Sequence, residues 1–485
     1  MSREKLFARL FYVPSTFFGT ALTVSSSNHR SRNNLRQRIN MKRTIFLSKF
    51  RPCRRTLFSL LGLAIVLLPV LAVNAQSLDG VSRGRAKDML NAVKNEIKGN
   101  YYDATFHGID LNGRFKIADE KLDKVTSMGQ AFGVIAQAVL ELNDSHTKFY
   151  PPSFAAKYEY GWRMQMIGDK CFVIAVKPKS DAEKKGLKPG DEILSVEGFR
   201  PNRKELWKVN YYYNQLSPRP GLNVTVRSPG DAEPRTLDLA AKVTPLKVIL
   251  NMEDIIRAYE LDEGRGSRHG FIKVGNSTIW KMPNFMLEPA SIDEIMSDRV
   301  AQSANLVLDL RGNGGGYVVA LERLAGYFVD ADTKIADLKG RKEMKPQMAK
   351  SRGDKVRKGK LIILLDSNSG SASEIFARFV QIQERGVVMG DQSAGAVMQS
   401  RSVPMKVGSD SIIPYGIGVT NADVFMSDGK SLEHVGVTPQ VFMVPSGADL
   451  AAQRDPVLAA ALELLGQTVT PEHAGKYFPF DWKDE

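Results

Sequence analysis

Hydrophobic residues recur at helical spacing between residues 78 and 142. The segment at residues 131–142, AFGVIAQAVLEL, places five apolar side chains on one helical face: Phe132, Ile135, Ala136, Val139 and Leu140. A Pro-Pro pair follows at residues 151–152, and proline cannot continue a helix. The pattern therefore predicts a small helical domain over residues 76–152.

The pattern changes from about residue 156, where apolar and polar residues alternate in short runs. Examples are CFVIAV at 171–176, EILSV at 192–196 and LNVTV at 222–226, with glycine, proline and aspartate residues between them. A period of two is typical of half-buried strands, and these residue types form the turns that separate strands. Residues 156–245 are therefore expected to form a compact β-rich module.

Strand and helix patterns alternate over residues 246–445, which predicts an α/β domain. NLVLDL at 305–310 runs into the turn RGNGGG, and LIILLD at 361–366 runs into a serine-rich turn. A helical pattern follows each turn, and main-chain N–H groups at the start of a helix favour negative charge. The stretch 330–360, rich in Lys and Arg, is expected to be a solvated connection, with a substrate-binding rim as the alternative, and residues 446–485 a C-terminal helical tail.

Residues 1–75 resemble a leader. Basic residues precede the apolar run LFSLLGLAIVLLPVLAV, which closes on Val-Asn-Ala at Ala75, and this order is that of a secretory signal peptide. The alternative is a transmembrane anchor, which the short run and Pro69 disfavour. Met41 is a possible start of the chain. We expect an exported protein, periplasmic or secreted, that begins near Gln76 and associates with a membrane only if the leader is retained.

The net charge of +14 is carried mainly by this leader. Residues 1–75 hold 13 of the 67 Lys and Arg residues and one of the 53 acidic residues, which leaves 54 basic against 52 acidic residues. A folded part that is almost neutral does not indicate a nucleic acid as partner. Cys171 is the only cysteine after the leader, so no intramolecular disulfide is expected.

Four short motifs follow one another in the second half of the chain. They are DLRGNGGG at 309–316, SGSASEIFA at 369–377, GDQSAGA at 390–396 and LEHVGVTPQ at 432–440. Their order resembles that of the C-terminal processing peptidases, also called tail-specific proteases. The resemblance implies an α/β core of the crotonase-like type with an inserted PDZ domain, to which the periodic pattern adds the N-terminal helical domain. It also implies serine peptidase activity that needs no metal or other cofactor.

A further motif lies in the β-rich module. GLKPGDEILSVEG at residues 186–198 resembles the signature of PDZ domains, which capture C-terminal peptide tails by adding a strand to a sheet edge. The alternative is a generic β-barrel with a Pro-Gly-Asp turn. The resemblance implies that the terminal carboxylate of a peptide binds main-chain N–H groups in one stretch: Tyr160, Gly161, Trp162, Arg163 and Met164.

The family's nucleophile corresponds to Ser371, the first serine of the SASE motif. Its place at a helix start suits an alkoxide, and the N–H of Ala372 would form half of an oxyanion hole. The other half would come from Gly314 or Gly315. The best-known members use a lysine 25 residues after the nucleophile as general base, but this chain has Ala396 there.

The tricorn-type branch of the family lacks that lysine and uses a Ser-His pair with a glutamate. Ser145 and His146 resemble the pair, and Glu433 resembles the glutamate. A histidine can accept the serine proton near neutral pH, and a carboxylate can fix its tautomer and orientation. His107 and His434 remain alternatives for the base.

The sequence thus predicts a serine endopeptidase that binds an exposed C-terminal segment in a PDZ-like groove and cleaves by acyl transfer through Ser371. Peptides or proteins with exposed C-terminal tails are the expected partners. The alternative is a catalytically silent scaffold that uses the same core to bind peptides or other ligands. Labelling by a fluorophosphonate separates the two hypotheses because it requires an activated serine.

Overall fold

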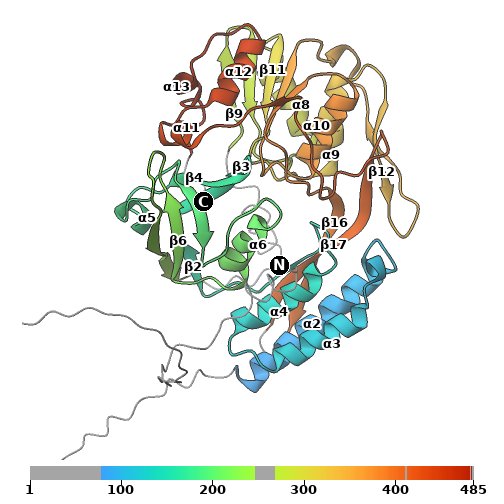
Figure 1. Ribbon diagram of the computed structural model, residues 1–485. Coiled ribbons are helices and arrows are strands. Elements are labelled where there is room, and N and C mark those ends of the chain that lie inside the picture. The colour runs from blue at the N-terminus through green and yellow to red at the C-terminus, as the bar shows by residue number, and fades with distance from the viewer. Residues whose placement is uncertain (1–77, 246–267, 410–411, 481, 483–485) are drawn as a thin grey trace, which may run out of the picture. The chain divides into compact units, whose positions relative to one another are not determined.

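The computed structural model describes residues 78–245, 268–409, 412–480 and 482 (Figure 1). The leader expected at residues 1–75, with its alternative start at Met41, lies outside the described residues. Within the described ranges, none of the helices combines the length and the apolar character that crossing a membrane would require.

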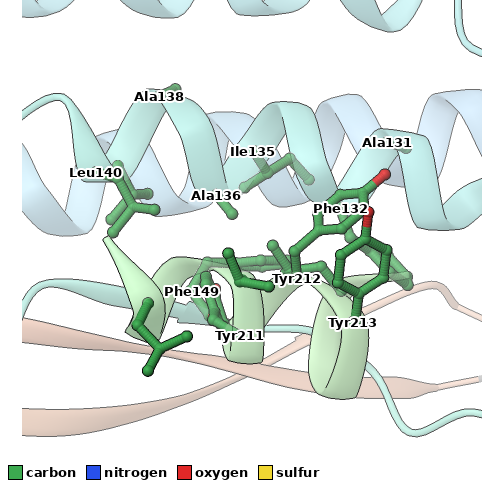
Figure 2. Close-up of a cluster of buried hydrophobic side chains, with 14 of the residues drawn as sticks. Ala131, Phe132, Ile135, Ala136, Ala138, Leu140, Phe149, Tyr211, Tyr212 and Tyr213 are labelled. Atoms are coloured by element: carbon green, nitrogen blue, oxygen red, sulfur yellow. The ribbon is translucent and has the colours of Figure 1, made fainter. Parts of the chain in front are cut away.

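Three helices form the first part of the described chain. They are α2 (Gly80–Asn100), α3 (Leu111–Leu122) and α4 (Met128–Leu140). An acidic or hydroxyl side chain caps the start of each helix by accepting a main-chain N–H, as Asp79 does from Ser82 at 2.9 Å. The predicted apolar face of α4 is buried, and Figure 2 shows it against Phe149 and three consecutive tyrosines, Tyr211, Tyr212 and Tyr213.

The β-rich module is a five-stranded antiparallel sheet in the order β3-β4-β5-β6-β7. Its strands are β3 (Trp162–Ile167), β4 (Lys170–Val176), β5 (Glu192–Val196), β6 (Gly221–Arg227) and β7 (Arg235–Ala240). Two short helices accompany them, α5 (Asp181–Lys184) and α6 (Leu206–Tyr211). A separate pair, β2 (Ala156–Glu159) and β8 (Lys242–Pro245), closes the module. The strand β3 lies at an edge of the five-stranded sheet.

A second, six-stranded sheet has the order β18-β15-β14-β11-β10-β9 and is parallel except for β9. The strands are β9 (Gly270–Val274), β10 (Ser277–Lys281), β11 (Asn305–Asp309), β14 (Leu361–Leu365), β15 (Val387–Gly390) and β18 (Val441–Phe442). Parallel strands alternating with helices are what the repeated strand-turn-helix pattern predicted.

Helices cover both faces of the six-stranded sheet (Figure 1). On one face lie α8 (Pro289–Ile295), α9 (Val318–Ala325) and α10 (Ala372–Ile382). On the other lies α12 (Pro456–Leu464), between the short helices α11 (Gly447–Ala451) and α13 (Pro471–Ala474). The turns after β11 and β14 each lead into one of these helices, α9 and α10, and both turns carry site residues.

A third sheet is built around the long strand β17 (Ile413–Met426), which pairs with β1 (Lys148–Tyr150), β12 (Thr333–Lys339) and β16 (Met398–Val407). The first half of β17 packs in the hydrophobic core of the helices α2–α4 and the β-rich module, through Tyr415, Ile417 and Val419. Its end packs in a second core, that of the six-stranded sheet, through Val424 and Met426.

The stretch 330–360 is only in part the solvated connection that its Lys and Arg content suggested. It contains β12 and a partner strand, β13 (Gln347–Ala349), and Ile335 and Ala336 are fully buried. The expectation fails for β12 because only Lys334 and Lys339 are exposed there, whereas the consecutive residues Ile335 and Ala336 enter the core of the six-stranded sheet at a register shift in the pairing with β13.

Candidate active site

Ser371 lies at the turn between β14 and α10 and precedes the first residue of that helix. Its backbone has φ +54° and ψ −119°, a region that residues other than glycine rarely occupy. The turn is held in this conformation by the Ser371 N–H, which donates to the Ala396 carbonyl at 2.9 Å and to Glu374 Oε2 at 3.0 Å. Strained backbone that is fixed in this way is common at functional sites.

The glycine-rich turn after β11 packs directly against the serine turn. Buried Asn313 joins the two, because its carbonyl accepts the Gly370 N–H and the Ser373 hydroxyl, both at 2.9 Å. Gly315 has φ +106°, and a Cβ there would lie 2.6 Å from Ser371 Cβ. Only glycine therefore permits this close approach.

Among the described residues, two main-chain donors in the serine turn and the glycine-rich turn are unengaged. The N–H of Ala372 at the first turn of α10 and the N–H of exposed Gly314 have no hydrogen-bond partner in the part of the chain that the structure describes. The N–H of Gly315 is already used, because it donates to Asn313 Oδ1 at 2.9 Å. Of the two glycines considered for an oxyanion hole, Gly314 therefore has the available donor.

Ser145, His146 and Glu433 form one hydrogen-bonded group, although 288 positions separate Ser145 from Glu433 in the chain. Ser145 Oγ donates to Glu433 Oε2 at 2.9 Å and lies 2.7 Å from His146 Nδ1. The Ser145 N–H donates to Glu433 Oε1 at 2.7 Å. The carboxylate thus reaches the ring through the serine hydroxyl rather than directly.

This arrangement determines which ring nitrogen of His146 carries the proton. A hydroxyl has one hydrogen, and Ser145 gives it to the carboxylate, so Ser145 Oγ must accept from Nδ1–H of His146. Nε2 of His146 then carries a lone pair and has no partner among the described residues. Burial lowers the pKa of His146 to about 4, with Asp144 opposing that shift, so the ring is neutral at neutral pH.

The Ser-His turn is positioned by Asp144 and by β17. One oxygen of the buried Asp144, Oδ1, accepts the N–H groups of His146 and Thr147 at 2.9 and 2.7 Å and the hydroxyl of Thr420 at 2.6 Å. Gly418 lies beside the turn, and a Cβ there would be 2.8 Å from the His146 carbonyl oxygen.

The two other candidate bases are engaged differently. His434 is exposed, and its Nε2 donates to the Asn143 carbonyl at 2.7 Å. That nitrogen also lies 3.6 Å from Glu433 Oε1, so His434 contacts both the glutamate and the turn before Ser145. His107 lies in the helical part, where its Nε2 is 3.0 Å from the Tyr101 hydroxyl.

Ser371 and His146 are not joined by a hydrogen bond in the described part of the chain. They are connected instead through the main chain at residues 396–397. The Ala396 carbonyl accepts the Ser371 N–H at 2.9 Å, and the Val397 N–H donates to Glu433 Oε2 at 2.8 Å. Catalytic hydrogen bonds are often long without substrate, so this geometry leaves His146 a candidate base.

The stretch expected to bind a peptide carboxylate lies at the start of the edge strand β3. Tyr160 and Gly161 precede the strand, Gly161 has φ +73°, and Trp162, Arg163 and Met164 are its first three residues. The other end of β3 contacts the turn before Ser371. There Gln165 Nε2 donates to Asp366 Oδ2 at 2.7 Å, and the Ser367 hydroxyl donates to the Met166 carbonyl at 2.5 Å.

Sequence reasoning missed the residues that hold this site together. Glu374, Asn313 and Asp144 are all buried, and each accepts several hydrogen bonds from the turns that carry the candidate residues. The sequence does contain one indication of the role of Glu374, because this residue stands three positions after Ser371, which is the spacing of a capping box.

In the described ranges, no group of three or more His, Cys, Asp or Glu side chains is placed so that it could hold a metal ion.

Comparison with known proteins agrees with this architecture. Residues 278–443 match the model of peptidase family S41. The chain is 25% identical over 345 residues to the carboxy-terminal processing protease CtpB of Bacillus subtilis, covering 67% of this chain and 65% of that protein. It is 25% identical over 397 residues to the chloroplastic C-terminal processing peptidase of Tetradesmus obliquus, covering 78% and 79%.

A third relative is the tail-specific protease of Haemophilus influenzae, 25% identical over 311 residues, which are 60% of this chain and 42% of that protein. The chain therefore spans from less than half to about four fifths of the length of these relatives. Among solved structures, mature CPAF has a similar fold, with a TM-score of 0.57 at 13% identity over 76% of this chain and 94% of that one. The resemblance to the C-terminal processing proteases is confirmed.

Proposed function

Taking the match of its core to peptidase family S41 as the premise, we propose that this protein is a serine endopeptidase of the C-terminal processing type, with Ser371 as nucleophile. One observation carries the proposal most directly. Ser145 joins His146 to Glu433 in an arrangement that leaves Nε2 of the ring unprotonated and without a partner. A base of that kind is what a serine nucleophile requires when no lysine stands at position 396.

In the proposed reaction, Nε2 of His146 takes the proton of Ser371 as Oγ attacks the carbonyl carbon of the scissile bond. The resulting imidazolium keeps its hydrogen bond to Ser145, and the charge of Glu433 stabilises it through that hydroxyl. His146 then gives the proton to the leaving amine, and an acyl group remains on Ser371. A water molecule, deprotonated by the same nitrogen, hydrolyses this ester and restores the serine.

The negative oxygen of the tetrahedral intermediate would be bound by main-chain donors. The Ala372 N–H and the Gly314 N–H are the candidates, because the Gly315 N–H already donates to Asn313. The start of α10 adds the positive end of the helix dipole at the same place. The packing of Gly315 against Ser371 supports this assignment, because it brings the glycine turn within reach of the nucleophile.

We propose that the β-rich module acts as a PDZ domain and presents the substrate. A peptide added to the edge strand β3 with its carboxylate at Gly161 would run antiparallel to that strand. Its upstream residues would then pass toward Gln165 and Met166, which hydrogen bond with Asp366 and Ser367. This route leads from the bound tail toward Ser371, only four residues beyond Ser367.

The same proposal includes export. The basic and apolar pattern of residues 1–75 supports passage to the periplasm or the exterior, with cleavage near Gln76. Protein or peptide substrates with accessible C-terminal tails would be met there. Mass spectrometry of the exported protein should find an N-terminus near Gln76, and an intact apolar run would instead support a membrane anchor.

Labelling with a fluorophosphonate tests the catalytic part of the proposal. The wild-type protein should be labelled at Ser371, Ser371→Ala should not be labelled, and His146→Ala should be labelled far more slowly. Ser297→Ala is the control, because Ser297 is an exposed serine in the π-helical segment Met296–Val300 that continues α8. If the folded wild-type protein resists labelling and cleaves no peptide, the silent scaffold is the better account of this core.

A further inference from the structure

A buried carboxylate lies directly behind the proposed nucleophile. Glu374 is in the first turn of α10, and its side chain is fully buried. Burial raises its pKa to about 7, against the lowering effect of its hydrogen bonds. Burying a carboxylate costs free energy unless hydrogen-bond donors surround it. The donors around Glu374 therefore indicate its structural role.

Four donors surround Glu374. Oε2 accepts the N–H groups of Ser371 and Ala396 at 3.0 and 2.9 Å. Oε1 accepts the Gly395 N–H at 2.7 Å and the Ser393 hydroxyl at 2.6 Å. Each carboxylate oxygen thus faces two donors, and an ionised carboxylate satisfies all four because it only accepts.

The contacts of Glu374 exceed those of a helix cap. In a capping box the glutamate accepts only the N–H of the cap residue, here Ser371. The other three donors belong to the segment Ser393–Ala396, which is remote in sequence. That segment continues into Val397, whose N–H donates to Glu433 Oε2 at 2.8 Å.

We propose that Glu374 is a positioning residue that sets the distance between the Ser371 nucleophile and the Glu433–Ser145–His146 group. It holds the Ser371 backbone with one oxygen and the segment that anchors Glu433 with both. Within the described residues, Ser371 makes no hydrogen bond to His146. The distance between the two side chains must therefore be set by contacts of the surrounding main chain, such as those that Glu374 makes. This inference rests on the proposed function and adds a residue to it.

The ionised form of Glu374 is the form that fits. A proton on Oε2 would point at the N–H groups of Ser371 or Ala396, and one of these would lose its acceptor. The groups that face Glu374 from the serine turn and from Ser393–Ala396 are uncharged, and the Val437 N–H donates to Ser393 rather than to Glu374. The charged side chains on adjoining segments have other partners: Asp391 pairs with Arg203, and Glu433 lies near His434.

The test compares three variants of the full chain. Glu374→Gln keeps the size of the side chain but places an amide donor opposite N–H donors. Ser393→Ala removes one donor from the segment and serves as a milder variant that keeps the test open if Glu374→Gln does not fold. Glu384→Gln is the matched control, because Glu384 lies just beyond the end of the same helix with an exposed side chain.

For Glu374→Gln we expect kcat to fall about a hundredfold with KM nearly unchanged, together with slower fluorophosphonate labelling of Ser371. Ser393→Ala should lower kcat less, and Glu384→Gln should behave as wild type. The labelling rate of the wild type should fall as the pH drops through about 7, and Glu374→Gln should lack this step. Circular dichroism checks the fold of each variant.

Three outcomes would overturn one or the other of the two proposals. If wild type is labelled at Ser371 but a folded Glu374→Gln keeps its kcat and the same step near pH 7, Glu374 is not a positioning residue. The same holds if Glu374→Gln does not fold and Ser393→Ala keeps wild-type kcat. If wild type is neither labelled nor active, the proposed function itself fails, whatever the Glu374 variants do.

Discussion

Ser371 and Glu433 are attached to opposite sides of one peptide group. The carbonyl of the Ala396–Val397 peptide accepts the Ser371 N–H at 2.9 Å, and its N–H donates to Glu433 Oε2 at 2.8 Å. The family's lysine would stand at position 396, where this chain has a residue with no basic group. The main chain at that position nevertheless links Ser371, the proposed nucleophile, to the Glu433–Ser145–His146 group, which contains the proposed base.

The bridging hydroxyl of Ser145 should be essential for the proposed base. Ser145→Ala removes the acceptor of the His146 Nδ1–H and the contact with Glu433, so the ring loses its fixed tautomer. We expect kcat/KM on a peptide substrate to fall about 10³- to 10⁴-fold. Ser145→Thr retains the hydroxyl and should restore part of the activity. Equal activity of wild type and Ser145→Ala would remove the relay from the mechanism.

His146 and His434 should respond differently to replacement. His146→Ala removes the base, and we expect kcat/KM to fall at least about 10³-fold. Combining it with Ser371→Ala should cost little more than either change alone, because the two residues act as one unit. His434→Ala removes the contacts with the Asn143 carbonyl and with Glu433 Oε1 but not the proposed base, and should cost about tenfold or less. The reverse order of the two single variants would make His434 the base.

The pH dependence should show His146 as an unusually acidic histidine. Burial lowers its pKa to about 4, so the proton that blocks Nε2 binds only below about that pH in the free enzyme. The rise of kcat/KM that belongs to His146 should therefore centre near pH 4 rather than near ~6.5. The pH profile of kcat/KM for Glu374→Gln should show the His146 step alone, because that variant lacks the separate step that Glu374 causes near pH 7. A rise near 6.5 in that variant would contradict the buried environment of the ring.

Gly315 and Gly312 provide a matched pair in one turn. Both have positive φ, but a Cβ at Gly312 meets nothing within 4 Å, whereas a Cβ at Gly315 would lie 2.6 Å from Ser371 Cβ. Gly312→Ala should lower the free energy of unfolding by about 1 kcal/mol through backbone strain and leave kcat unchanged. Gly315→Ala should lower kcat about a hundredfold, because it displaces the nucleophile or the oxyanion donors. Equal kcat for the two variants would mean that this contact is unimportant.

Tail recognition by the β-rich module predicts a preference for free C-termini. A peptide with a free carboxylate should bind at least about tenfold more tightly than its amidated form, measured by calorimetry on Ser371→Ala. Gly161→Ala should reduce the difference, because a Cβ there would lie 2.6 Å from Ser180 Cβ and distort the loop. Gly186→Ala is the control, with positive φ and open space around it. Equal affinity for both peptides would exclude carboxylate capture.

Local sequence patterns predicted much of this fold. The apolar face of α4, the strands β4, β5 and β6, and the two strand-turn-helix units around Gly315 and Ser371 lie where periodicity and turn residues placed them. These elements are specified by contacts close along the chain. The proposed grouping of Ser145 with Glu433 came from a family resemblance, because no local pattern encodes a contact across 288 positions.

The features that the sequence did not predict depend on distant packing. The stretch 330–360 is rich in Lys and Arg, yet β12 pairs with β17 and places Ile335 and Ala336 in the core of the six-stranded sheet. Glu374 looked like an ordinary cap residue, and only the folded chain places Ser393 and two main-chain donors around it. The contact of Gln165 with Asp366 likewise joins modules that the sequence presents as separate.

The long strand β17 has a consequence for how the protein denatures. Its first half belongs to the core shared by α2–α4 and the β-rich module, and its end belongs to the core beneath α10. Because one strand contributes residues to both cores, unfolding of either core would disturb the part of β17 that packs in the other. Both cores should therefore melt in one cooperative transition. The helices expressed alone as residues 76–152 would lack Tyr415 and Ile417, and we expect that fragment to be unfolded. The amide protons of β17 should be among the slowest in the chain to exchange with deuterium.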